Sequence, residues 1–161
     1  SVTAPRDIQN SEQAKIIFFS LSESVAERLR GYALKGGKVH LSLRSNDLLR
    51  IERQIKLPQP TNLSGEIYSA AMTLLAKNYN WERPLRGAGI RVSELTPENA
   101  PYQLNMLGEH IKRERSEKLE RCIQQLRGRF GYWAVARGSV LTDKSLSRAE
   151  LSDCSLPQAG L

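Results

Sequence analysis

The sequence predicts an α+β fold in which two helices cover one face of a four-stranded antiparallel sheet, followed by a C-terminal helical tail. Alternating polar and apolar residues mark the strands, and apolar residues at steps of three and four mark the helices. The order is strand, helix, strand, strand, helix, strand, which is the split β-α-β pattern. The chain has 161 residues, enough for one domain with its own core.

The first strand is expected over residues 2–8, with Pro5 at an edge or an end because proline donates no hydrogen bond. A long helix follows. Asn10 and Gln13 resemble a capping box at its start. Gly36-Gly37 is expected to end it, because glycine adopts the left-handed conformation without strain. The apolar stripe that predicts the helix consists of Ala14, Ile17, Phe18, Leu21, Val25, Leu29 and Tyr32.

A hairpin is expected over residues 38–57. Polar and apolar residues alternate over residues 38–44 and again over 49–57, which is the period of a half-buried strand. Asn46 and Asp47 between them favour a turn. Arg53 falls among the apolar positions, so either the strand bulges there or Arg53 lies at a sheet edge.

A second helix and a last strand complete the sheet and its cover. Pro58-Gln-Pro60 is expected to end the hairpin, because proline cannot continue a ladder. The last strand is expected over residues 85–95, where Gly87 and Gly89 indicate a bulge or a close backbone approach. The second helix has its apolar stripe over residues 67–75. Its candidate caps are Thr61, Asn62 and Ser64.

Beyond residue 95 the composition changes. We expect residues 1–95 to form the domain, 96–108 a proline-containing linker, 109–141 a charged helix with an extension, and 142–161 a polar, partly disordered tail. The chain does not begin with Met, and we therefore expect it to be a fragment of a longer protein.

Composition sets modest bounds on function. Lysine and arginine number 24 against 17 acidic residues, giving a net charge of +7 and a pI near 9.7. Such an excess favours polyanions or anionic membranes, although charge alone is a weak argument. Cys122 and Cys154 show neither metal-ligand spacing nor a disulfide framework, which is typical of an intracellular protein. No apolar run is long enough to span a bilayer, so we expect no membrane partner.

Catalysis finds little support. His40 and His110 have no partners at triad or ligand spacing. The Arg-Gly-Ala-Gly run at residues 86–89 lacks the following helix that a nucleotide-binding loop needs. No pair of carboxylates indicates a metal site. We predict no catalytic and no metal-binding residue in this chain.

The polar side of the predicted sheet favours nucleic acid. It mixes cations with His40, Ser42 and Gln54, a combination that suits phosphate contacts. No aromatic ladder lies on these strands, so a duplex backbone is a better ligand than single-stranded bases. An ordinary solvated sheet face explains the pattern equally well. The cations concerned are Lys38, Arg44, Arg50, Lys56 and Arg91.

Four segments together carry a resemblance to a known family. They are Thr-Ala-Pro-Arg-Asp-Ile at residues 3–8, Val-His-Leu-Ser-Leu-Arg at 39–44, Arg-Gln-Ile-Lys-Leu-Pro at 53–58 and Leu-Arg-Gly-Ala-Gly-Ile-Arg-Val-Ser at 85–93. In this order the chain resembles the little-finger domain of Y-family translesion DNA polymerases of the UmuC/DinB type. The resemblance implies a sheet that lies in the major groove of the primer–template and holds both backbones.

The resemblance also implies roles for single residues. By position, Thr3 and Arg6 would lie on the first strand near the template backbone. Ile55 stands where the family often has another basic residue, which puts one phosphate contact in doubt. The basic matches on the middle hairpin and the last strand are Arg44, Arg53 and Arg91.

A second resemblance lies in the linker. Gln103-Leu-Asn-Met-Leu107 is similar to the pentapeptide with which such polymerases dock on the sliding clamp. Gln103 would make oriented hydrogen bonds while Leu104, Met106 and Leu107 fill an apolar pocket. The family usually ends this motif in Leu-Phe, so weaker binding is expected. The alternative is a hydrophobic patch that packs the linker onto its own domain.

The resemblance implies a fragment of a DNA-repair polymerase active in the SOS response to DNA damage, bacterial and cytoplasmic, associated with the nucleoid during repair. Its catalytic palm, with the expected Mg²⁺ ions, would lie upstream in the same chain, so the fragment should be inactive alone and needs no cofactor of its own. Its partners would be primer–template duplex, sliding clamp and the upstream domains. Two rivals are an RNA-binding module on a ferredoxin-like sheet and a protein–protein adapter.

Overall fold

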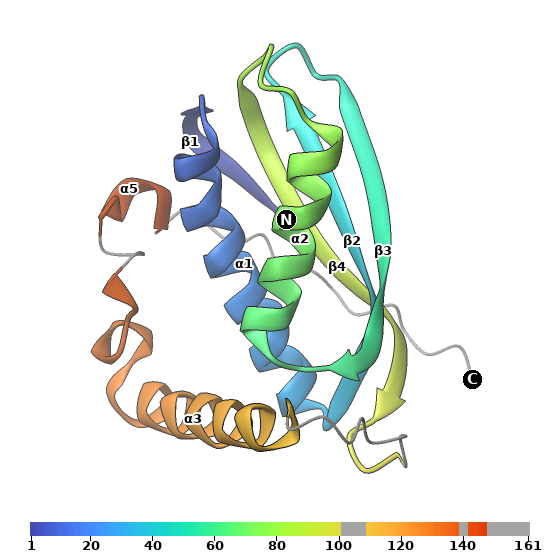
Figure 1. The fold of residues 1–161 in the computed structure, drawn as a ribbon. Coiled ribbons are helices and arrows are strands. Elements are labelled where there is room, and N and C mark those ends of the chain that lie inside the picture. Colours follow the sequence, from blue (N-terminus) through green and yellow to red (C-terminus); the bar gives the residue numbers. More distant parts are fainter. Residues whose placement is uncertain (101–108, 139–141, 148–161) are drawn as a thin grey trace, which may run out of the picture.

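The computed structural model describes residues 1–100, 109–138 and 142–147. Its main unit consists of β1 (Val2–Ile8), α1 (Ser11–Gly31), β2 (Leu34–Ser45), β3 (Arg50–Thr61), α2 (Ser64–Asn78) and β4 (Leu85–Pro97). The four strands form one antiparallel sheet in the order β1-β4-β2-β3. Both helices lie on the same face of it (Figure 1). The predicted α+β fold is therefore confirmed.

The core lies between the sheet and the two helices. Val39, Leu41 and Leu43 alternate along β2, and each is at most 2% exposed. They belong to one cluster with Phe18 of α1 and Ile67 of α2. Burying an aliphatic or aromatic side chain of this size contributes about 1.5–3 kcal/mol. The sheet face turned away from the helices, called the open face below, carries the polar residues of the same alternation.

Helix α1 begins as predicted but ends earlier. Asn10 Oδ1 accepts a hydrogen bond from the Gln13 N–H at 3.0 Å, and Gln13 Oε1 accepts from the Gln9 N–H at 2.9 Å. The prediction that Gly36-Gly37 ends the helix is wrong, because both glycines lie in β2. Ala33 takes the left-handed conformation instead, with φ +52°.

Gly36 has a different physical role. A Cβ at this position would lie 2.0 Å from Cγ1 of Val92 on β4. Glycine is therefore required because β2 and β4 approach closely, and not because a helix ends there.

Strand β3 continues through its two prolines to Thr61. The prediction that Pro58-Gln-Pro60 ends the hairpin is therefore wrong. The pairing with β2 shifts between Lys38↔Lys56 and Gly36↔Thr61. Both prolines lie in this irregular stretch, where the ladder tolerates residues without an N–H.

A residue distant in sequence caps the N-terminus of α2. None of the predicted candidates provides a side-chain cap there. Instead, the Glu120 carboxylate of α3 (Glu109–Phe130) accepts from the Ser64 N–H at 3.0 and 3.1 Å and from the Ser64 hydroxyl at 2.7 Å. The same carboxylate pairs with Arg30 of α1 at 2.5 Å. One acidic side chain thus joins three helices.

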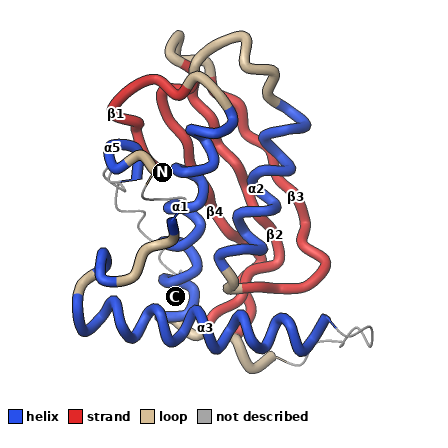
Figure 2. The backbone as a smooth tube through the Cα atoms, turned by 60° about the vertical axis from the view of Figure 1, so that its left-hand side comes forward, coloured by secondary structure: helices blue, strands red, loops and turns tan. Residues whose placement is uncertain are grey.

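Helix α3 lies across the end of α1 and the start of α2 (Figure 2). Besides Glu120, its Arg127 pairs with Glu23 at 3.2 Å, and both side chains are less than 10% exposed. Tyr132 of the short helix η1 (Tyr132–Ala134) also donates to Glu23, at 3.1 Å. Burial raises the pKa of the Tyr132 hydroxyl to about 12. Buried charged groups therefore hold α3 against the main unit.

The segment predicted as a partly disordered tail begins with structure. Helix α5 (Lys144–Ser147) packs beside α1 and β1, and its Leu146 is 1% exposed within the core. Asp143 Oδ1 caps it by accepting from the N–H groups of Ser145 and Leu146 at 3.1 and 3.2 Å. Residues 148–161 lie outside the described residues, so the rest of that prediction is untested.

Candidate nucleic-acid interface

Cross-strand pairing assembles four rows of side chains on the open face, because directly opposed residues of antiparallel strands point to the same side. All five predicted cations lie in these rows, together with Thr3. The rows are Lys56–Lys38–Ser93, Gln54–His40–Arg91, Glu52–Ser42–Gly89 and Arg50–Arg44–Gly87–Thr3.

Arg44 lies flat across the sheet. It extends over Gly87 of β4, and its Nη2 donates to Thr3 Oγ1 of β1 at 3.0 Å. A Cβ at position 87 would lie 3.4 Å from the Arg44 Nε, so glycine at this position allows the guanidinium to pack against β4. The Arg44 Nε is buried and has no hydrogen-bond partner among the described residues. The contact with Thr3 uses one of the five N–H donors of the guanidinium, and the terminal nitrogens keep others for an incoming acceptor.

His40 occupies the middle of the face. Its Nε2 lies 2.6 Å from Ser93 Oγ, and its Nδ1 lies 3.4 Å from Arg91 Nη2. Because a guanidinium only donates, Nδ1 accepts and the proton sits on Nε2, which makes the ring neutral. Burial lowers the pKa of the His40 imidazole below its ordinary value of 6.5, and the charges of Arg91 and Lys38 lower it further.

Small residues hollow the centre of the open face. Ser42 and Gly89 face each other across β2 and β4. They border a shallow hollow of about 330 Å³, whose rim includes His40, Gln54 and Arg91. Ser1 closes part of this hollow, because a Cβ at position 89 would lie 3.2 Å from the Ser1 Cβ.

Two carboxylates reduce the positive charge of the open face. Glu94 pairs with Lys38 at 2.6 Å, and the hydrogen bond from Lys38 lowers the pKa of that carboxyl. Glu52 faces Ser42. Five cations against two anions still leave the open face positive.

Arg53 lies on the other side of the sheet from the five cations of the open face. The duplex contact that the resemblance implies for it stays a prediction. The β2–β3 register is continuous from Lys38↔Lys56 to Arg44↔Arg50, so no bulge occurs there. Of the two explanations left open, the edge position is right, because β3 is an edge strand. Arg53 is opposite the buried Leu41 and leaves the sheet on the helix side, where its Nε donates to Asn78 Oδ1 at 3.2 Å.

Arg6 is likewise separated from the row of Thr3. It forms an ion pair with Asp143, the residue that caps α5. The β1–β4 register shifts between Thr3 and Ile8, so the pairing of Thr3 with Gly87 does not extend to Arg6. The contact with the template backbone that the resemblance implies for Arg6 stays a prediction.

The clamp-like motif, with Gln103, Leu104, Met106 and Leu107, lies outside the described residues, so its role stays a prediction. Among the residues that the structure describes, no group of three His, Cys, Asp or Glu side chains could hold a metal ion. None of the described helices is long and apolar enough to cross a membrane.

Sequence reasoning missed the interaction of Ser93 with His40 and that of Thr3 with Arg44. Strand parity placed these residues on one side. However, the contacts depend on the strand order, in which β4 separates β1 from β2. A sequence pattern does not contain that order.

Comparisons with known proteins find relatives named DNA polymerase IV. DNA polymerase IV of Acetivibrio thermocellus is 40% identical over 148 residues, covering 92% of this chain. DNA polymerase IV of Clostridium kluyveri is 33% identical over 147 residues, covering 88% of this chain. The chain spans only 37% and 36% of the length of these relatives.

A solved structure is also similar. It is the complex of the β-clamp processivity factor with the little finger domain of PolIV, at a TM-score of 0.49 and 19% identity. The match covers 65% of this chain and 93% of that one.

The family model described as the impB/mucB/samB family C-terminal domain matches residues 1–106. That match covers more than half of the 161 residues. It confirms the resemblance that the sequence motifs indicated. The chain therefore belongs to the impB/mucB/samB family and contains its C-terminal domain.

Proposed function

We propose that this chain is the duplex-binding little-finger domain of a translesion DNA polymerase and holds the sugar–phosphate backbones of the primer–template on its open face. The supporting observation is the set of rows that align Lys38, Arg44, Arg50, Lys56 and Arg91 across β2, β3 and β4. None of the four strands carries Phe, Tyr or Trp, which argues against stacking on single-stranded DNA or RNA.

The proposal includes the rest of the polymerase. The relatives named DNA polymerase IV are about two and a half times as long as this chain, and the palm with its Mg²⁺ ions would belong to the additional length. Nucleotidyl transfer past DNA lesions would occur there, in the bacterial cytoplasm at the nucleoid. The motif with Gln103, Leu104, Met106 and Leu107 would attach the enzyme to the sliding clamp.

Duplex binding is expected to weaken steeply with salt. Each phosphate contact contributes a slope of about −0.9 to log K against log salt, so five contacts give about −4.5. Raising the salt from about 50 to about 200 mM would then lower affinity about 500-fold. Fluorescence anisotropy with duplexes of several sequences measures this. A flat salt response, or binding confined to one sequence, would contradict backbone recognition.

Duplex binding is also expected to strengthen as the pH falls from about 8 to about 5.5. The free domain keeps His40 neutral because its pKa is lowered. A bound phosphate would raise the pKa again, so the complex would bind more protons than the free domain. The gain therefore appears as pH falls through the pKa of the complex and levels off below the pKa of the free domain. Each pKa unit of difference between His40 in the complex and His40 in the free domain corresponds to about tenfold in affinity.

The control for this pH effect is His40→Gln, which keeps a neutral hydrogen-bonding side chain but cannot gain a proton in this range. The variant should bind duplex with an affinity that hardly changes between the two pH values. An unchanged pH response in His40→Gln would assign the effect to another group, such as His110.

A further inference from the structure

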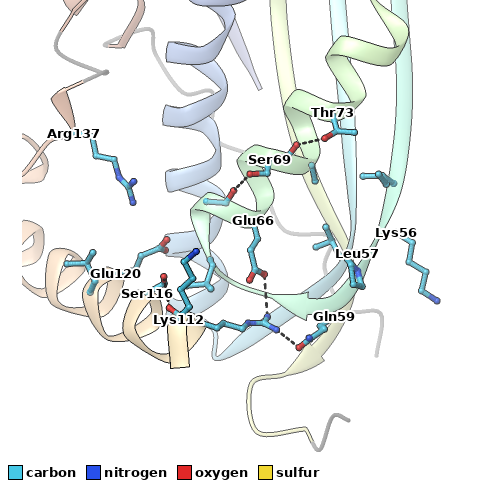
Figure 3. Close-up of a pocket in the computed structure, with 17 residues that line it drawn as sticks. Lys56, Leu57, Gln59, Glu66, Ser69, Thr73, Lys112, Ser116, Glu120 and Arg137 are labelled. Atoms are coloured by element: carbon cyan, nitrogen blue, oxygen red, sulfur yellow. Dashed lines mark hydrogen bonds and ion pairs between the residues drawn. The ribbon is translucent and has the colours of Figure 1, made fainter. Parts of the chain in front are cut away.

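A large cleft lies away from the open face, between the edge strand β3 and the helices α2 and α3 (Figure 3). Its volume is about 800 Å³. Each of the three elements supplies one wall, and α3 supplies its wall because Glu120 and Arg127 dock it on the main unit. The cleft is therefore a feature of the docked C-terminal helix and not of the sheet alone.

The cleft contains exposed aliphatic surface. Leu57 of β3 and Leu119 of α3 line it, and Leu119 is 55% exposed. The α2 wall presents small side chains, because Gly65, Ser69 and Thr73 face the cleft. The hydroxyls of Ser69 and Thr73 bond to carbonyls of their own helix, both at 2.9 Å. The wall can therefore accept bulky aliphatic groups without leaving a hydroxyl unpaired.

The charge available to a ligand in the cleft is positive. Its two carboxylates are engaged, Glu66 with Arg113 at 3.4 Å and Glu120 in the cap of α2. Lys112 on the α3 rim makes no ion pair within the part of the chain that the structure describes, and Arg137 adds a second cation to the lining. Cations beside exposed aliphatic surface are complementary to carboxylates that flank aliphatic side chains.

The outer edge of β3 adds backbone groups. Strand β3 ends the sheet on this side, so one edge of it pairs with no other described strand. Pro58 and Pro60 remove donors from its last residues. The Glu52 carbonyl accepts from Arg53 Nη1 at 2.8 Å. Between Glu52 and Pro58 the outer edge faces no other described strand and can pair with an extended chain.

We infer that this cleft docks a short segment of a partner protein that combines aliphatic side chains with carboxylates. Nucleic acid fits it poorly, because a sugar–phosphate backbone offers nothing aliphatic to fill the floor. A second copy of this chain fits poorly as well, because the net charge of +7 makes copies repel each other. The inference goes beyond duplex binding and does not depend on it.

The test begins with short random peptides displayed on phage and selected on the full chain. The expected consensus combines Leu, Ile, Val or Phe with Asp or Glu. The best peptide is then labelled and titrated against the wild type and three variants. Leu119→Glu removes an exposed aliphatic side chain of the cleft and repels carboxylates, and Lys112→Glu reverses the charge on the α3 rim. Lys118→Glu is the matched control, because Lys118 is 75% exposed on α3 and does not line the cleft.

Leu119→Glu and Lys112→Glu should each lower the affinity for the peptide by about tenfold or more, while Lys118→Glu should leave this affinity unchanged. Duplex DNA should not displace the peptide. A basic consensus, no enrichment, equal loss in all three variants or displacement by duplex would each overturn the inference. Circular dichroism of the variants distinguishes lost binding from lost folding.

Discussion

Replacing Glu120 by alanine is expected to lower the free energy of unfolding by about 3–5 kcal/mol, because the substitution removes one partner of a buried ion pair and leaves the charge of the other partner buried. The Arg30 and Glu120 side chains are 11% and 8% exposed. Without the carboxylate, the Arg30 charge stays buried, with Gln124 and the carbonyl of Asn62 as its remaining acceptors. The Ser64 N–H also loses its acceptor at the start of α2. Urea denaturation measures the loss.

Lys118→Ala is the control for this experiment. Lys118 pairs with Glu114 on the same helix, but the two side chains are 75% and 50% exposed. An ion pair in water contributes little, so this variant should stay within about 0.5 kcal/mol of the wild type. If Glu120→Ala were no less stable than Lys118→Ala, the proposed docking of α3 through buried charges would be wrong.

The sheet and its two helices could be predicted from the sequence, because their signal is local. Alternation along residues 38–44 fixes which side of β2 is buried, and the stripe with Ile17 and Phe18 fixes the buried face of α1. Both patterns depend only on the period of the element. The same parity placed Lys38, Arg44 and Arg91 on one face before the strand order was known.

The docking of α3 could not be predicted in this way. Arg30 and Glu120 are 90 residues apart, and Glu23 and Arg127 are 104 apart. In sequence, α3 looks like a solvated helix with a thin apolar stripe, because charged residues are usually exposed. Only the fold shows that its buried contacts are ionic. Arg53 is a different case, because strand parity already placed it among the apolar positions. The fold adds that β3 is an edge strand, which the sequence could not decide.

Arg44→Glu is expected to lower duplex affinity by roughly tenfold or more at low salt, equally for all sequences. Arg44 stands in the row that joins β3, β2, β4 and β1, and its contact with Thr3 uses only one of the five guanidinium N–H donors. The reversal removes a phosphate contact and adds repulsion. Arg53→Glu should cost much less, because Arg53 leaves the edge strand on the helix side.

One comparison tests most directly whether the open face is the surface that holds the duplex. Arg44→Glu and Arg115→Glu change the net charge of +7 by the same amount, but Arg115 is exposed on α3, away from the sheet. Anisotropy titrations with one duplex at one low salt concentration should show a loss of about tenfold or more for Arg44→Glu and less than about twofold for Arg115→Glu. Equal losses, or a larger loss for Arg115→Glu, would contradict binding through the open face.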